Sequence, residues 1–169
     1  MIRSSQRPIL LLDAIQENPG IKFREIMHLT GLKNGVVSHH LSKLEKNGDI
    51  RVIRGPRQTR FFSPCITEDE SIVIKALRIQ TPCDLLLALI KEDGLKFSQL
   101  VKEVKKSPST VSLYLSQVVE DGLVEIKIVQ FKKRYHIKTR DLVDKLIEDY
   151  MPGLLEEPTS GFEDIFNSL

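Results

Sequence analysis

The sequence has no tryptophan, few aromatic residues and only two cysteines among its 169 residues. Two cysteines are too few to build a disulfide-stabilised secreted domain. No apolar run approaches the ~20 residues that a membrane helix needs, and no apolar segment follows the basic N-terminus as in a signal peptide. These absences exclude integral membrane proteins and small secreted scaffolds. We therefore expect a cytoplasmic protein with no membrane partner.

Charge is unevenly distributed, although the net charge of the chain is only +2. Residues 1–67 hold 11 Lys and Arg against 5 Asp and Glu, and residues 82–138 hold 10 against 7. Residues 139–169 reverse the balance, with 2 basic against 8 acidic residues. Basic segments are typical of modules that bind polyanions such as nucleic acids. The sequence thus predicts two basic modules and an acidic tail.

A single internal repeat organises the chain. When the sequence is shifted by 74 residues, positions 8–64 align without a gap on positions 82–138 and share 13 identities. The identical pairs include Pro8 with Pro82, Gly20 with Gly94, Ser38 with Ser112, Gly48 with Gly122, and Arg60 with Arg134. An ungapped register that keeps both glycines and apolar positions indicates two copies of one module. We call residues 8–64 the first repeat and residues 82–138 the second repeat.

Each repeat has the apolar spacing of three helices followed by two strands. In the first repeat, we expect helices over 9–18 and 24–29, an extended piece at 21–23, a third helix that ends at Gly48, and strands over 50–54 and 59–63. In the second repeat, the matching helices cover 83–93 and 98–104, and the extended piece covers 95–97. The third helix ends at Gly122, and the strands cover 124–129 and 133–138. Val37, Leu41 and Leu44, at i, i+4 and i+7, give the third helix one apolar stripe.

Helix, strand, helix, turn, helix and hairpin is the order of a winged helix-turn-helix domain. Residues 26–50 resemble the core of ArsR/MarR-type transcriptional regulators, whose recognition helix often reads Thr-Val-Ser-x-His-Leu before Leu-Glu-x-x-Gly. Val36 replaces the threonine, and the residues that fit are Val37, Ser38, His40, Leu41, Leu44, Glu45 and Gly48. The second repeat matches more loosely, over 110–122. The tandem arrangement resembles small archaeal regulators, and the resemblance implies a double-stranded DNA partner.

The expected fold class is mainly α with small β-wings, an α+β protein with two tandem winged helix-turn-helix domains. We place the first domain at 1–66, a helical linker at 67–81 and the second domain at 82–139. Thr67 is a suitable N-cap for the linker helix. A C-terminal amphipathic helix and an acidic tail complete the chain at 140–169.

In a helix-turn-helix, the second helix enters the major groove, and the resemblance implies that the wing lies on the backbone or in the minor groove. The first repeat offers Lys33, Asn34, Ser38, His39, His40 and Lys43 in its recognition helix and Arg51, Arg54, Arg57 and Arg60 in its wing. The second repeat offers Ser107, Ser109, Thr110, Ser112 and Tyr114, then Lys127, Lys132, Lys133 and Arg134. Asn pairs with adenine and Lys with guanine, whereas wing arginines suit phosphates. A solvated charged surface is the alternative interpretation.

The second recognition helix differs from the first because it carries no Lys or Arg between Ser107 and Asp121. Leu113 and Val119 also lie off its apolar stripe, which is compatible with docking or dimerisation. The alternative function is therefore a tandem winged-helix protein-interaction subunit of a chromosome-organising or transcription complex. Such a protein would resemble the kleisin-binding subunits of condensin-type complexes.

The C-terminal segment offers candidate partner contacts. Leu142, Leu146 and Tyr150 belong to the apolar stripe of an expected helix over 141–151, which either packs on the body or pairs with its twin in a homodimer. In the acidic tail, Phe162 and Phe166 have the spacing of a helical docking motif that suits a protein partner. A disordered tail is the alternative interpretation.

No pattern indicates an enzyme. The sequence lacks a glycine-rich phosphate loop, a His-Glu-x-x-His motif and a Gly-x-Ser-x-Gly motif. His39 and His40 are adjacent, so on a helix they point about 100° apart and cannot easily share one metal ion. Cys65 and Cys83 form no Cys-x-x-Cys motif and are expected to be buried hydrophobes, with a redox pair as the alternative. We expect no catalytic residue, no metal and no cofactor.

Overall fold

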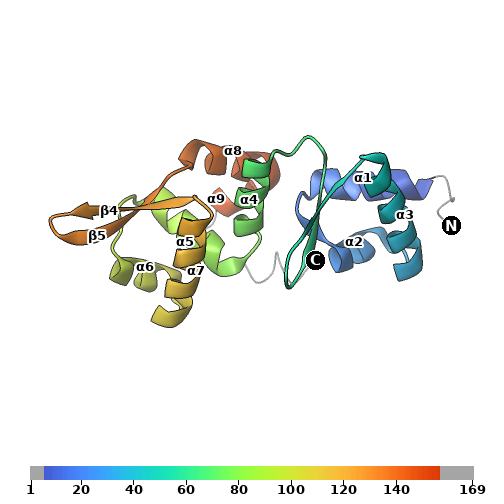
Figure 1. The fold of residues 1–169 in the computed structure, drawn as a ribbon. Helices are drawn as coiled ribbons and strands as arrows, with labels where there is room; N and C mark the ends of the chain where they lie inside the picture. Colours follow the sequence, from blue (N-terminus) through green and yellow to red (C-terminus); the bar gives the residue numbers. More distant parts are fainter. Residues whose placement is uncertain (1–5, 157–169) are drawn as a thin grey trace. The chain divides into compact units, whose positions relative to one another are not determined.

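The structure is a computed structural model that describes residues 6–156 (Figure 1). The chain divides into two compact units, one that contains the first repeat and one, Ile72–Asp149, that contains the second repeat. The division falls within helix α4 (Glu68–Leu77). No helix among the described residues is long and apolar enough to cross a bilayer.

The first unit contains the three helices and the wing predicted for the first repeat. They are α1 (Arg7–Glu17), β1 (Ile21–Lys22), α2 (Phe23–Thr30), α3 (Asn34–Asn47), β2 (Arg51–Arg54) and β3 (Thr59–Phe62). The strands form an antiparallel sheet in the order β1-β3-β2. Val37, Leu41 and Leu44 are buried, as their spacing predicts, and pack in one core with residues of α1, α2 and the sheet.

The second unit repeats this plan with a longer, two-stranded wing. Its elements are α5 (Gln80–Lys91), α6 (Phe97–Val104), α7 (Pro108–Glu120), β4 (Val124–Val129), β5 (Lys132–Ile137) and α8 (Arg140–Tyr150). Leu95, the equivalent of Ile21, makes only an isolated bridge to Tyr135, so the predicted extended piece is not a strand. The β4–β5 hairpin therefore extends beyond α5, α6 and α7 (Figure 1).

The connection between the repeats differs in detail from its prediction. α4 ends at Leu77 rather than at Gln80, and α5 begins at Gln80 rather than at Cys83. Pro82 therefore lies in the first turn of α5, where a helix tolerates proline because the N–H groups there have no intrahelical partner. Thr67 caps α4 as predicted: its Oγ1 accepts from the Glu70 N–H at 3.2 Å, and its own N–H donates to the Glu70 carboxylate at 2.8 Å.

One arginine-to-carbonyl contact recurs in both repeats. Arg60 Nη1 donates to the Gly20 carbonyl at 2.7 Å, and Arg134 Nη1 donates to the Gly94 carbonyl at 2.9 Å. Both glycines have φ +77°, which favours glycine. A Cβ on Gly94 would also lie 2.9 Å from Cε1 of His136. In each repeat, this contact ties the returning strand of the wing to the turn that follows the first helix.

Candidate nucleic-acid interface

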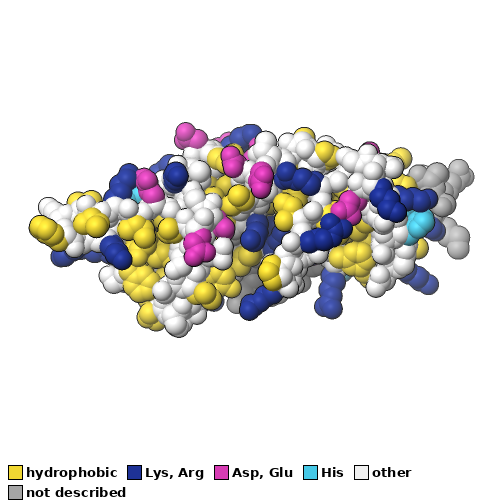
Figure 2. All heavy atoms as spheres, viewed as in Figure 1, with side chains coloured by type: hydrophobic (Ala, Val, Ile, Leu, Met, Phe, Trp, Pro, Cys, Tyr) yellow, Lys and Arg dark blue, Asp and Glu magenta, His cyan; other side chains and the backbone are white. Residues whose placement is uncertain are grey.

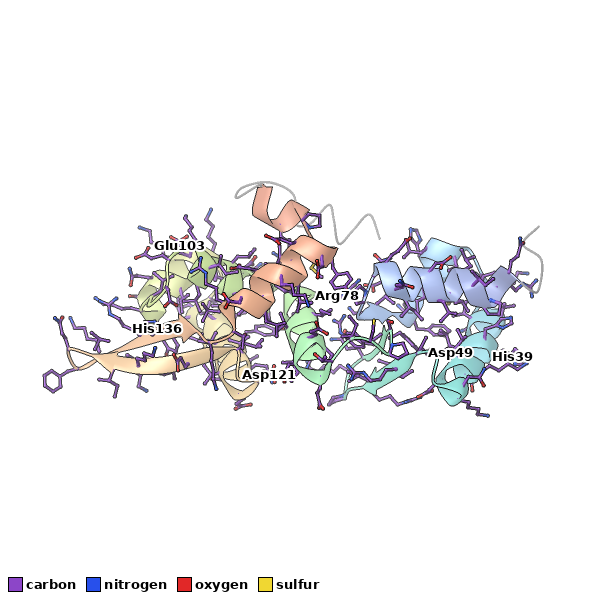
Figure 3. All side chains as sticks on the ribbon, turned by 90° about the horizontal axis from the view of Figure 1, so that it is seen from above. His39, Asp49, Arg78, Glu103, Asp121 and His136 are labelled. Atoms are coloured by element: carbon purple, nitrogen blue, oxygen red, sulfur yellow. The ribbon has the colours of Figure 1, made fainter. Side chains whose placement is uncertain are left out.

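The N-terminal half of α3 presents polar groups to solvent. Of the predicted contacts in this helix, five are exposed, namely Lys33, Asn34, Ser38, His39 and Lys43, and His40 is half-buried. His39 points away from the rest of its unit (Figure 3). Lys33 is the N-cap residue, and no acidic side chain lies in the first turn. Ammonium, amide, hydroxyl and imidazole groups are those that contact phosphates and base edges.

The two adjacent histidines of α3 form an edge-to-face pair with their ring centroids 5.3 Å apart. The pKa of His40 lies below its ordinary value, first because of burial and then because of the neighbouring charges of His39, Arg7 and Lys43. The neutral ring is favoured at neutral pH and offers one donor and one acceptor. Within residues 6–156, no cluster of three or more His, Cys, Asp or Glu side chains is suited to hold a metal ion.

The first wing is fixed to the recognition helix by an ion pair. Arg54 donates from both terminal nitrogens to the two Glu45 carboxylate oxygens, at 2.7 and 2.8 Å. These hydrogen bonds hold the pKa of Glu45 below its usual value. Because Glu45 lies in α3 and Arg54 in β2, the pair sets the wing against the helix. Arg57 is exposed in the loop between the strands.

The other two arginines of the first wing serve the fold. Arg51 donates to the Thr67 carbonyl at 3.1 Å, and its guanidinium lies 5.9 Å from the centre of the Phe62 ring. The prediction that Arg60 contacts DNA is wrong: the residue is 3% exposed and donates to the Gly20 carbonyl. A guanidinium buried within its own domain cannot reach a phosphate. Arg134, half-buried at the equivalent position of the second repeat, makes the same contact.

In the second repeat, the predicted hydroxyl residues at the start of α7 bond to one another. Ser107 caps the helix by accepting from the Thr110 N–H at 3.2 Å, and its hydroxyl lies 3.0 Å from that of Ser109 and 2.8 Å from that of Thr110. Ser112 is exposed and Tyr114 is half-buried. Leu113, which is 67% exposed, also lies on this helix. The outer face of α7 is therefore hydroxylic and apolar.

The sequence analysis missed two cations that immediately precede α7. Lys105 and Lys106 are exposed in the turn between α6 and α7, and Lys105 has φ +55°. Their equivalents in the first repeat are Gly31 and Leu32, so a comparison of recognition helices alone does not find them. The signal that would have found them is the charge of the turn itself. Two ammonium groups there suit phosphate oxygens.

One side of the second wing is mainly apolar and the other mainly charged, with Lys133 opposite Ile128 and Val129 opposite Lys132. Its register pairs Ile126 with Tyr135 and Lys127 with Arg134, and opposite residues of an antiparallel pair share a face. Ile126 and Ile128 are exposed, and so are the predicted contacts, Lys127, Lys132 and Lys133. Hydrophobic side chains gather at the end of the hairpin, with Lys or Arg beside them (Figure 2).

The predicted partner contacts in α8 need correction. Leu146 is 1% exposed because it fills the interior of its own chain together with Val143 and Ile147, so it cannot contact a second copy. Leu142 and Tyr150 are only partly exposed. The α8 stripe thus packs on the body, one of its two predicted roles. Phe162 and Phe166 lie outside the described residues.

Comparison with known families finds one match in each repeat. Residues 6–51 match the winged helix-turn-helix DNA-binding family, and residues 80–125 match the bacterial regulatory protein, arsR family. Both are families of DNA-binding domains. No curated protein matches the chain. With a three-helix core and a wing in each repeat, the chain is a DNA-binding regulator with two tandem winged helix-turn-helix domains, the second of which is similar to the arsR family.

Proposed function

We propose that the protein is a sequence-specific transcriptional regulator whose α3 enters the major groove of duplex DNA. The observation that carries this proposal is the exposed polar side of α3, where Asn34 lies in the first turn and Lys43 lies further along the helix, in a stretch, residues 33–44, that contains no acidic residue. Asparagine pairs with adenine and lysine with guanine in that groove. Sequence reading is therefore assigned to the first repeat.

The first wing supports this assignment. Arg54 is held against α3 by Glu45, so the wing and the recognition helix approach DNA as one surface. Arg57, exposed in the loop of the wing, is the cation free to follow the backbone or the minor groove. Contacts of this kind position a protein on DNA without reading its sequence.

The second repeat contributes contacts of a different kind. Its recognition helix has no cation, but Lys105 and Lys106 precede it and Lys132 and Lys133 follow it in the wing. These ammonium groups suit the phosphates on either side of a groove. We assign the second repeat to the DNA backbone rather than to base edges.

The proposal includes a homodimer, since paired helix-turn-helix domains bind two half-sites that mirror the symmetry of the protein. Leu146 is buried, so the contact between copies lies elsewhere than the α8 stripe. Sedimentation of the wild type tests this part of the proposal, with a dimer expected.

The test of the proposed function is binding of the full chain to duplex DNA at several salt concentrations. We expect affinity for random duplex to fall steeply with salt, by ~0.9 in the log–log slope per phosphate contacted. A duplex recovered by selection from a random pool should bind about 10³-fold tighter or more. Equal affinity for selected and random duplexes would contradict sequence-specific reading.

The exposed Leu113 on α7, a helix without Lys or Arg, also favours a second candidate, a winged-helix subunit that binds protein through the second repeat. This candidate predicts no binding to any duplex even at low salt. The same titrations therefore separate the two functions, because phosphate contacts strengthen as salt is removed.

A further inference from the structure

The tip of the second wing is built around a fully exposed aromatic ring. β4 and β5 are joined by only two residues, Gln130 and Phe131, and Phe131 is 102% exposed. A phenylalanine in water forgoes the free energy that its burial would provide. The hairpin extends beyond the three helices of its unit (Figure 1), and Phe131 lies in the turn that joins its strands.

The backbone at this tip is in a conformation that its residues disfavour. Gln130 has φ +50° and Phe131 has φ +61°, both in the left-handed region. Two-residue hairpin turns with two positive φ values are best formed by sequences such as Asn-Gly, because a Cβ is strained there. Neither burial nor turn geometry explains a phenylalanine at this place. Its side chain therefore indicates a role in binding and not in folding.

The surroundings of the ring suit a polyanion. Residues 124–138 hold five Lys and Arg against one Glu. Lys132 directly follows Phe131, and Lys133 follows it, both exposed. The one acidic residue, Glu125, is paired with Lys127 at 2.7 Å. An apolar wedge flanked by cations is the arrangement that proteins use to enter the minor groove and unstack a base step.

We propose that Phe131 inserts between neighbouring base pairs from the minor groove and kinks the duplex, while Lys132 and Lys133 contact the flanking phosphates. This inference rests on the proposed DNA binding and adds a shape-reading role for the second repeat. The position of Phe131 in the second repeat is that of Arg57 in the first. One wing tip thus carries a cation for the backbone and the other a wedge for the base stack.

A second copy of the chain fits this tip less well than DNA does. Two hairpins of the same strong positive charge repel each other. Stable protein interfaces bury about 800 Å² on each partner, whereas the apolar surface here is a few side chains on a narrow two-stranded ribbon.

The test compares the full-length wild type with Phe131→Gly and Phe131→Leu. The probes are a 30-base-pair duplex and the same duplex with a central two-base mismatch, which is already partly unstacked. The wild type should bind the mismatched duplex about tenfold tighter or more and bring its labelled ends closer in energy-transfer measurements, because unstacking is costly in an intact duplex. Phe131→Gly should lose both effects, and Phe131→Leu should retain part of them.

The controls distinguish a failure of the Phe131 wedge from a failure of DNA binding. Glycine suits the positive φ of the turn, so Phe131→Gly should unfold at the wild-type temperature or above, and its salt slope should stay unchanged because no cation is removed. If Phe131→Gly keeps the mismatch preference and the bend, the wedge is overturned while DNA binding stands. A shift of Phe131→Gly from dimer to monomer would also overturn it, in favour of a protein contact. If the wild type binds no duplex at low salt, the proposed function fails together with the wedge.

Discussion

The two recognition helices share a core-facing stripe and differ on the side that faces outward. At equivalent positions, His39 and Lys43 of α3 are matched by Leu113 and Gln117 of α7. The buried stripe keeps its spacing in both helices. The fold thus constrains the buried face of each helix, and the outward face is free to carry different side chains.

The wings extend this contrast. Glu45 and Arg54, the ion pair that ties the first wing to α3, are matched by Val119 and Ile128 in the second repeat. Both positions are apolar in the second repeat, so neither of them carries a charge without its partner. The first repeat consequently has a cationic wing linked to its recognition helix by an exposed ion pair, and the second has an apolar hairpin edged by lysines.

The largest expected effect concerns the contact that the repeats share. Arg60→Ala should lower the free energy of unfolding by about 2–3 kcal/mol, because it removes a charge-assisted hydrogen bond and leaves a buried carbonyl without its donor. Arg134→Ala should cost only about 1 kcal/mol, since Arg134 is half-buried. Urea unfolding of both variants measures these values. Equal losses would show that the two repeats depend on this contact alike.

Base reading should be confined to the first repeat. Asn34→Ala should weaken binding to the selected duplex by ~1–3 kcal/mol and leave binding to random duplex unchanged, because a base contact is lost. Ser38 and Ser112 form a matched pair, with the same residue at equivalent, exposed positions. Ser38→Ala should alter the preferred sequence and Ser112→Ala should not. A change in preference from Ser112→Ala would mean that α7 reads bases too.

The two wing tips should differ in their dependence on salt. Arg57→Ala should weaken binding to every duplex and reduce the salt slope by ~0.9, the contribution of one phosphate contact. Arg57→Lys should preserve the slope, since it retains the charge. Binding isotherms at four salt concentrations suffice for the measurement. An unchanged slope in Arg57→Ala would remove the first wing tip from the interface.

The smallest effect is expected from the ion pair of the first wing. The pKa of Glu45 is lowered from 4.5 by the hydrogen bonds from Arg54, so the pair stabilises the fold above about pH 4.5 and loses this effect as the pH falls through the lowered value. Thermal unfolding of Glu45→Gln should lie slightly below that of the wild type at neutral pH and coincide with it in acid. A difference that persists in acid would attribute the effect to packing.

Much of the fold follows from periodicity and the repeat. The stripe of Val37, Leu41 and Leu44 predicts both α3 and its buried face, and the shift of 74 residues transfers that prediction to α7. Gly48 ends α3 with φ +78°, as its position predicts. These patterns depend on neighbouring residues in the sequence, so they predict local structure without knowledge of the tertiary contacts.

The misplaced site residues depend on information that is not local. The face of Arg60 follows from the pairing of β2 with β3 across a loop, and strand alternation alone does not determine that register. Phe131 lies in the turn that the sequence predicts between the two strands, but its full exposure depends on how the hairpin packs, which the turn alone does not indicate. For Leu146, the sequence left two alternatives open, packing on the body or contact with a second copy, and only the packing of the folded chain decides between them.

The second wing also has an open strand edge that could promote aggregation, and its lysines oppose this. Among the described residues, β4 pairs only with β5, so its other backbone edge is open beside Ile126 and Ile128, the latter 73% exposed. An open edge next to apolar side chains is a template for strand addition between molecules and for aggregation. The lysines at 132 and 133 act as gatekeepers that repel an approaching hairpin. The solubility of the free protein should therefore fall as salt screens these charges, and DNA should protect it.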